Sequence, residues 1–382
     1  MNYTQNEKIS QITPSSLIVG IDIAKEKHVA RAQDDRGMEF GKRLIFENRE
    51  HGFEMLCEWV VKHQKKQGKN HVIFGVEPTG HYWLSLAYYL KERGFDFVIV
   101  NPMHVKKSKE LDDNSPTKND TKDAKVIAQL IKDGRYSVPN LLEGIYAELR
   151  EGVKVRDQLS KQLMITEGRI QNNLQRYFPE FFDVFKDWSG KAAICSLRCF
   201  PPFPSDVIQL TAEAVLAQWK TEVKAGVGIK RAQQLIDKAN KSIGIQEGLR
   251  FAKREIHDLL DQYMLYQQQL EAIEEELEEL VKEIPGAVEM IAIRGIGAMT
   301  VAGFYAEVGD IRRYRHPQQV INMAGYTLKE HSSGKHKGQT RITKRGRSKL
   351  RKLLYMAVRL LSPIIQRFRH YMSIIQIEKN AL

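Results

Sequence analysis

Cysteine is scarce in this sequence, with three residues among 382. Three cysteines cannot form a disulfide framework, and Cys195 and Cys199 lack further Cys or His residues at the short spacing of a zinc site. The N-terminus MNYTQNEK is polar, and no run approaches the roughly 18 apolar residues of a membrane span, so the sequence favours neither secretion nor membrane insertion. We expect a cytoplasmic protein with reduced thiols.

Acidic residues are nearly missing from residues 311–369. Between Ile311 and Arg369 there are 16 Lys and Arg and one acid, Glu330, which gives about +15 against +12 for the whole chain. Such a concentration of positive charge favours a polyanionic partner. With 42% hydrophobic and 28% charged residues the chain is of the globular class, and its length allows two or three domains.

The first part of the chain predicts an α/β fold. Residues 17–46 indicate three strands, in the segments LIVGIDIA, HVARAQD and FGKRLIF, with the last two joined by the turn at 34–37. A helix from about 49 to 64, the strand HVIFGVE, a helix from about 79 to 93, the strand FDFVIV and a helix beginning near Asp120 follow. A meander and then two strands reached through helices is the order of the ribonuclease-H-like fold.

The middle of the chain predicts long helices. Residues 141–178 and 249–283 are polar helical patterns, and the second carries an apolar seam spaced like a coiled coil. The seam residues are Leu270, Ile273, Leu277, Leu280 and Val281. Two ordinary surface helices are the alternative, and an insert at about 180–248, containing the breaker-rich CFPPFPS, predicts a helical subdomain between them. We therefore divide this α/β plus α chain at 1–140, 141–284 and 285–382.

Four carboxylates form the candidate catalytic set. Asp22 lies within an apolar run, where a carboxylate loses its hydration and needs a cation or hydrogen bonds. Glu77 ends a second apolar run, and Asp120 and Asp123 lie three apart at a predicted helix start, hence on one face. Singly, Glu77 reads as a turn residue, Asp120 as an N-cap and Asp123 as a first-turn acid. Together they lie where the ribonuclease-H-like fold gathers carboxylates, which predicts bound Mg²⁺.

The basic segment carries two candidate nucleic-acid contacts. Arg294-Gly295-Ile296-Gly297 joins two apolar helical stretches, a pattern typical of helix-hairpin-helix modules that hold phosphates, with a plain tight turn as the alternative. The segment from His331 to Gly338 is small, polar and cationic, which predicts an exposed loop. On composition alone, Ser332 and Ser333 are loop residues beside a phosphate-binding patch. The patch comprises Lys335, Lys337, Lys344, Arg345, Arg347, Lys349 and Arg351.

Six segments in order resemble one known family. GIDIAK, GVEPTG, NDTKDAKVIA, RGIGAMTVAGFYAEVGD, AGYTLKEHSSGKHKG and ITKRGRSKLRKLL are similar in order and spacing to DEDD-type insertion-sequence transposases, which are serine recombinases guided by a bridge RNA. The resemblance runs from about residue 17 to 362 and is weakest at 180–248. It implies a resolvase-like domain with a Mg²⁺ site at Asp22, Glu77, Asp120 and Asp123.

The same resemblance implies a C-terminal transposase domain whose nucleophile is Ser333, with Ser332 as the alternate. It further implies donor and target DNA and a guide RNA as partners, coiled-coil assembly into homodimers or homotetramers, and a place at the nucleoid. The reaction would leave a phosphoserine and conserve the energy of the broken bond, and the sequence indeed has no G-x-x-x-x-G-K-[ST] loop for ATP.

Three other readings remain open at this point. A Mg²⁺-dependent junction nuclease would activate water with the same four acids and never use Ser333. A non-catalytic nucleic-acid-binding protein would need only the basic segment, and the buried position predicted for Asp22 argues against it. An actin-like sugar kinase opens with a similar strand and Asp, but its second motif is missing here.

Overall fold

A computed structural model describes residues 4–112, 120–200, 203–224, 226–329, 332–333, 336–337 and 340–364; the side chains of 110–112, 120–121, 329, 332–333 and 336–337 lie outside this description. The chain divides into two compact units, Met1–Leu142 and Glu143–Leu382. Both the long helices and the basic segment, which the sequence interpretation separates at residue 284, fall within the second unit. Each unit is described by itself below.

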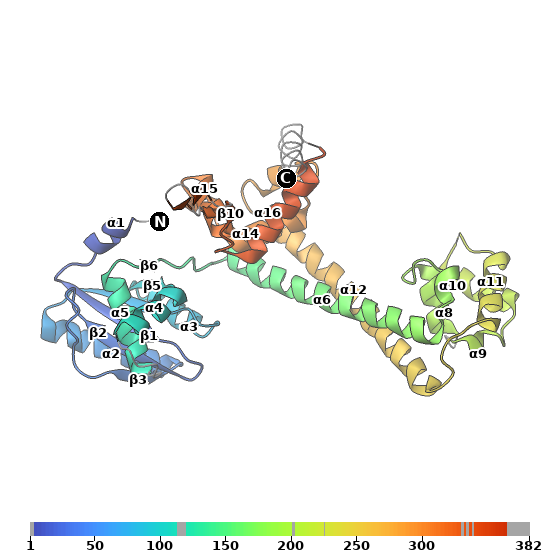
Figure 1. The fold of residues 1–382 in the computed structure, drawn as a ribbon, viewed down its shortest axis with the longest axis horizontal. Coiled ribbons are helices and arrows are strands. Elements are labelled where there is room, and N and C mark those ends of the chain that lie inside the picture. The colour runs from blue at the N-terminus through green and yellow to red at the C-terminus, as the bar shows by residue number, and fades with distance from the viewer. Residues whose placement is uncertain are drawn as a thin grey trace. The chain divides into compact units, whose positions relative to one another are not determined.

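The first unit is built on a six-stranded mixed sheet in the order β3-β2-β1-β4-β5-β6 (Figure 1). The strands are β1 (Ser16–Asp22), β2 (Lys27–Gln33), β3 (Leu44–Glu47), β4 (His71–Val76), β5 (Asp96–Val100) and β6 (Tyr136–Ser137). β1, β2 and β3 form an antiparallel meander, and β4 and β5 continue the sheet parallel to β1. This confirms the predicted strand order. β6, a two-residue strand antiparallel to β5, was not predicted.

Helices cover both faces of this sheet. They are α1 (Gln5–Ser10), α2 (Glu50–Gln67), α3 (Leu84–Glu92), α4 (Pro102–Asp112) and α5 (Asp120–Lys132). Apolar residues of α2 and α3 pack on one face, against Leu17, Val19 and Ile21 of β1. Residues of α4 and α5 pack on the other, against Ile18 of β1 and Ile73 of β4. Side chains alternate along a strand, so β1 and β4 each send every second residue toward α5.

Two paired glycines let α5 approach the sheet closely. Gly20 of β1 lies opposite Gly75 of β4 in the parallel register. A Cβ on Gly20 would lie 2.1 Å from the carbonyl oxygen of Ala124 and 2.5 Å from the nitrogen of Ala128. The backbone of α5 therefore rests directly on β1, which fixes where the first turn of α5 lies relative to the strand ends.

The second unit is organised around an antiparallel pair of long helices, α6 (Ile145–Tyr177) and α12 (Leu249–Lys282) (Figure 1). Arg156 and Glu274 form an ion pair at 2.7 Å in one part of the pair, and Asn173 Nδ2 donates to the carbonyl of Ala252 at 3.3 Å in another. Between these helices the chain forms a helical subdomain around the fully buried Trp219. Its helices are α7 (Phe181–Val184), α8 (Lys191–Cys199), α9 (Pro204–Val207), α10 (Ala212–Glu222) and α11 (Ile229–Asn240).

The basic part of the second unit packs on the other end of this helix pair. Its elements are α13 (Ala287–Ile291), α14 (Ala298–Val308), η1 (Ile311–Arg313), α15 (Pro317–Ala324), β7 (Leu328–Lys329), β8 (Ser332–Ser333), β9 (His336–Lys337), β10 (Arg341–Ile342) and α16 (Ser348–Leu361). The apolar helix α14 is buried against Leu149 of α6 and against Leu277 and Val281 of α12. Among the described helices, none is both long and apolar enough to cross a membrane.

Candidate functional site

Two of the predicted carboxylates follow directly from the ends of neighbouring parallel strands. Asp22 is the last residue of β1, and Glu77 comes directly after Val76, the last residue of β4. Ile21 and Val76, which precede them, are partners in the register. Side chains two residues apart along a strand lie on the same face. Asp22 therefore shares the face of Gly20, and Glu77 that of Gly75, which is the face that carries α5. Both side chains are half-buried.

The close approach of α5 brings another predicted carboxylate, Asp123, near Glu77. Asp123 directly precedes Ala124, whose carbonyl lies at Gly20, and its side chain is 19% exposed. Burial raises the pKa of Glu77, the charge of Lys109 opposes that rise, and the charge of Asp123 adds to it. Glu77 and Asp123 are thus near enough to act on each other. Asp120 is the first residue of α5, one turn before Asp123, and its side chain lies outside the described residues.

A lysine that the sequence did not single out completes this group. The Nζ of Lys109, from α4, lies 2.5 Å from Oδ2 of Asp123. Lys109 is one of three lysines in the stretch KKSK, and nothing in the sequence distinguishes it from Lys106 or Lys107. Only the packing of α4 beside α5 does so.

These residues fit a hard divalent cation. Carboxylate oxygens are the ligands that Mg²⁺ prefers, and Glu77 and Asp123 already attract one positive charge, that of Lys109. Within the described side chains, no three His, Cys, Asp or Glu residues form a metal-binding group. Asp22, Glu77 and Asp123 are all described, so these three do not form such a group by themselves; the side chain of the predicted fourth member, Asp120, lies outside the described residues.

The two loops that follow Asp22 and Glu77 are tied together by one side chain. The Nδ2 of Asn48 donates to the carbonyl of Lys25 at 3.4 Å and to that of Tyr82 at 3.3 Å, while its backbone N–H donates to Glu26 at 2.8 Å. Asn48 therefore spans the turn after β1 and the segment between β4 and α3. Nothing in the sequence singles out Asn48, because both acceptors of its side chain are backbone groups brought close only by the fold.

A buried histidine lies beside this amide. His28 is fully buried against Phe46 and Phe53, and its Nδ1 accepts a hydrogen bond from the backbone of Ala24 at 3.3 Å. Burial lowers the pKa of His28, and the side chain of Asn48 raises it. His28 is thus a neutral core histidine on the sheet face opposite the carboxylates.

The predicted nucleophile lies in a strand pair and not in a loop. β8 and β9 are antiparallel, with Ser333 opposite His336 and Ser332 opposite Lys337. At residues 332–333 and 336–337 two short strands therefore replace the predicted loop, which rested on small polar residues that are common in both; the exposure predicted for this segment lies outside the described residues. Lys335 lies outside the described residues, and of Ser333 and Lys337 only the backbone is described.

Three of the predicted nucleic-acid contacts make intramolecular bonds. Nη1 of Arg351 donates to the carbonyls of Ala324 at 2.8 Å and Lys344 at 3.2 Å. Nζ of Lys349 lies 2.7 Å from Oδ2 of Asp157 on α6. The guanidinium of Arg347 donates to the carbonyl of Glu307. Arg347 and Arg351 are partly buried, whereas Lys349 is exposed; composition alone could not show the bonds that these residues make.

Other predicted contacts are exposed. Lys344 and Arg345 are exposed in the turn that precedes α16. This turn packs tightly on the end of α15, because a Cβ on Gly346 would lie 2.4 Å from the carbonyl oxygen of Met323. Lys344 itself has φ 54°, a left-handed conformation. Arg294 is exposed between α13 and α14, and Gly295, with φ +95°, makes the bend there.

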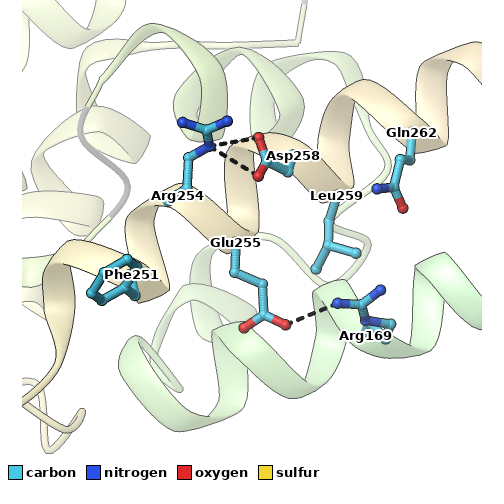
Figure 2. Close-up of a pocket in the computed structure, with 7 residues that line it drawn as sticks. All are labelled: Arg169, Phe251, Arg254, Glu255, Asp258, Leu259 and Gln262. Carbon is cyan, nitrogen blue, oxygen red and sulfur yellow. Dashed lines mark hydrogen bonds and ion pairs between the residues drawn. The ribbon is translucent and has the colours of Figure 1, made fainter.

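A pocket on α6 and α12 contains none of these residues (Figure 2). Arg254 bonds Asp258 at 2.9 Å, and Arg169 bonds Glu255 at 3.2 Å. Its charges thus neutralise each other, and it has no feature of a catalytic site.

Two protein-family models match this chain, and the matched ranges include the candidate site residues. A family model described as a transposase, for the DEDD domain of IS110 elements, matches residues 19–179 and so includes all four carboxylates. A second, described as the transposase IS116/IS110/IS902 family, matches residues 289–373 and includes the serine and the basic candidates. The chain belongs to the IS110 family of transposases.

Two curated proteins that are similar to this IS110-family chain share less than 30% sequence identity with it. The transposase for insertion sequence element IS1111A of Coxiella burnetii is 29% identical over 123 residues, which are 32% of this chain and 33% of that protein. The protein y4uE of Sinorhizobium fredii, provisionally named a transposase, is 25% identical over 171 residues, 44% of this chain and 46% of that protein. The chain thus matches less than half the length of each relative.

Proposed function

We propose that this protein is a DNA transposase that cleaves and rejoins DNA strands through a phosphoserine at Ser333, with Mg²⁺ held by Asp22, Glu77, Asp120 and Asp123. The observation that carries the proposal is the convergence of Glu77 and Asp123, with Asp22 ending the adjacent strand. We take residues 1–140 as a ribonuclease-H-like domain, 141–284 as the assembly segment and 285–382 as the transposase domain.

The chain's own residues have distinct roles in this reaction. The hydroxyl oxygen of Ser333 attacks a backbone phosphorus, a Ser–O–P bond forms, one P–O bond of the DNA breaks, and the departing oxygen takes up a proton as the serine loses one. Bound Mg²⁺ would neutralise the phosphate and stabilise the leaving oxygen. Rejoining reverses these bonds with a new strand end, so no ATP is consumed.

The exposed cations serve binding. Lys344 and Arg345 face solvent from a rigid turn, a placement that suits contacts to DNA or RNA phosphates. Target choice is delegated to a guide RNA that pairs with donor and target DNA, while the protein reads backbone and shape. The active assembly is a homodimer or homotetramer held by the long helices.

A water-dependent junction nuclease is the second candidate. One observation favours it: Asp22, Glu77 and Asp123 all belong to the first unit, whereas Ser333 belongs to the second. A nuclease would need only the first unit for its chemistry.

A covalent-adduct assay tests the choice. Purified protein with its copurifying RNA, Mg²⁺ and labelled DNA spanning an element end would be compared with Ser333→Ala, Asp22→Ala and the matched control Ser332→Ala on a denaturing gel. We expect an SDS-resistant adduct in wild type and Ser332→Ala that disappears in the other two variants. Cleavage without an adduct that persists in Ser333→Ala and is lost in Asp22→Ala would establish the nuclease instead.

A further inference from the structure

The carboxylate group contains a positive charge of its own. Lys109 Nζ lies 2.5 Å from Asp123 Oδ2, and its charge acts on Glu77 as well. The Lys109 side chain is 34% exposed and that of Asp123 is 19% exposed, so the pair is partly withdrawn from water. Two neighbouring carboxylates in such a place repel each other, and a nearby cation relieves the repulsion.

We propose that Lys109 is a tethered counter-ion that occupies the carboxylate site in the metal-free protein and is displaced when a divalent cation binds. This inference rests on the proposed metal site. The ammonium and a divalent ion bound to the same carboxylate repel each other at this short range, so metal binding at Asp123 favours withdrawal of Nζ from its position 2.5 Å from Oδ2. Lys109 therefore stabilises the metal-free state and weakens metal binding.

The neighbouring charges make Lys109 the suitable counter-ion. Lys125, on the same helix as Asp123, pairs with Glu39 at 2.8 Å. Lys107, two residues before Lys109 on α4, is exposed. Removing Lys109 thus takes away a cation that acts on both Glu77 and Asp123, whereas removing Lys107 takes away a surface charge of the same kind from the same helix.

Thermodynamic linkage gives the expected signs. A ligand that binds only the folded protein stabilises it by an amount that grows with its concentration over its Kd. Without Lys109 the metal-free protein keeps uncompensated carboxylates and melts at a lower temperature. The metal then meets no competitor, so half of its stabilising effect is reached at a lower concentration.

The test uses the full chain, stripped with EDTA and dialysed. Thermal unfolding is followed while Mn²⁺ is titrated into wild type, Lys109→Met, the charge-keeping Lys109→Arg and the control Lys107→Met. We expect Lys109→Met alone to melt lower without metal and to reach half of its Mn²⁺ shift at a several-fold lower concentration. Equal half-saturation in wild type and Lys109→Met would overturn the counter-ion role while leaving the metal site standing.

A second measurement covers failure of the methionine variant to fold. Free Mn²⁺ is counted by electron paramagnetic resonance at 20 °C with Lys109→Gln, which keeps a donor but no charge, and tighter binding than in wild type is the expected result. If Mn²⁺ neither binds nor shifts the melting of any protein, the proposed metal site and the counter-ion role both fail. If Mn²⁺ binds every variant equally, only the counter-ion role fails.

Discussion

At each end of the central sheet an acidic side chain contacts a basic one. The two ends differ because a second carboxylate lies nearby at only one of them. At the carboxyl ends of β1 and β4, Glu77 and Asp123 both interact with the cation Lys109. At the other end, His71 lies between two partners, with Nε2 2.8 Å from Asp96 Oδ2 and Nδ1 3.3 Å from Ser16 Oγ.

This second group has the residue types of a Ser-His-Asp triad, yet its geometry is structural. Ser16 is fully buried and its Oγ also accepts the backbone N–H of Thr13 at 3.0 Å, so no substrate can reach it. A candidate site is therefore recognised by access and by neighbouring carboxylates, and the residue types alone would mislead.

The largest loss of stability should come from a substitution that prevents α5 from approaching β1 at Gly20. In Gly20→Ala the added methyl would lie 2.1 Å from the carbonyl oxygen of Ala124, a backbone atom that cannot step aside. We expect the first unit to lose on the order of 3 kcal/mol or more, measured by urea unfolding followed with circular dichroism.

Gly75→Ala is the matched control on the partner strand. Its new methyl meets the Cδ1 of Ile131 at 2.3 Å, the end of a flexible side chain that can rotate. The loss should be smaller, about 1 to 2 kcal/mol. Equal losses in the two variants would contradict the view that α5 is seated by its backbone on β1.

The strands and crossovers of the first unit could be predicted from sequence because their signal is local. Apolar runs and turn residues mark β1 to β5, and alternation within them assigns the faces. β6 was missed because two residues show no period, and α4 because its sequence is mostly polar. The strand pair at Ser333 was read as a loop since Ser and Lys are common in both.

The candidate site likewise contains residues that the sequence marks and residues that only the packing brings in. Asp22 and Glu77 could be found because an acid at the end of an apolar run is conspicuous in a sequence. Lys109 and Asn48 could not, since their partners are 14 or more residues away and become neighbours only through packing. The nucleic-acid contact of Arg351 stays a prediction, and its bonds to backbone carbonyls could not be foreseen because they leave no trace in composition.

A smaller effect concerns the buried histidine behind the carboxylate end. Because burial lowers the pKa of His28 below its ordinary 6.5, the unfolded chain binds a proton at a pH where the folded protein does not. The free energy of unfolding should therefore be highest above pH 6.5 and fall as the pH drops toward the folded pKa, by up to about 1.4 kcal/mol per pH unit. Urea unfolding from pH 8 to 5 measures this slope.

His28→Gln should flatten that slope relative to wild type. Burial and the charges of Lys66 and Lys62 also lower the pKa of His63, so wild type contains a second contribution over the same range. His63→Gln separates the two. A slope in His28→Gln as steep as in wild type would mean that His28 charges freely in the folded state.

The smallest effect should come from the opposite end of the sheet. The side chains of His71 and Asp96 are 38% and 67% exposed, and ion pairs at that exposure contribute about 0 to 1 kcal/mol, so a double-mutant cycle of His71→Gln and Asp96→Asn should give a coupling in that range.

The Mn²⁺-dependent melting shift sharpens the contrast: Asp123→Asn should abolish it and Asp96→Asn should leave it unchanged. Both acids contact one base at under 3 Å, so equal loss of the shift in the two variants would show that the neighbouring carboxylate Glu77 does not distinguish the two ends.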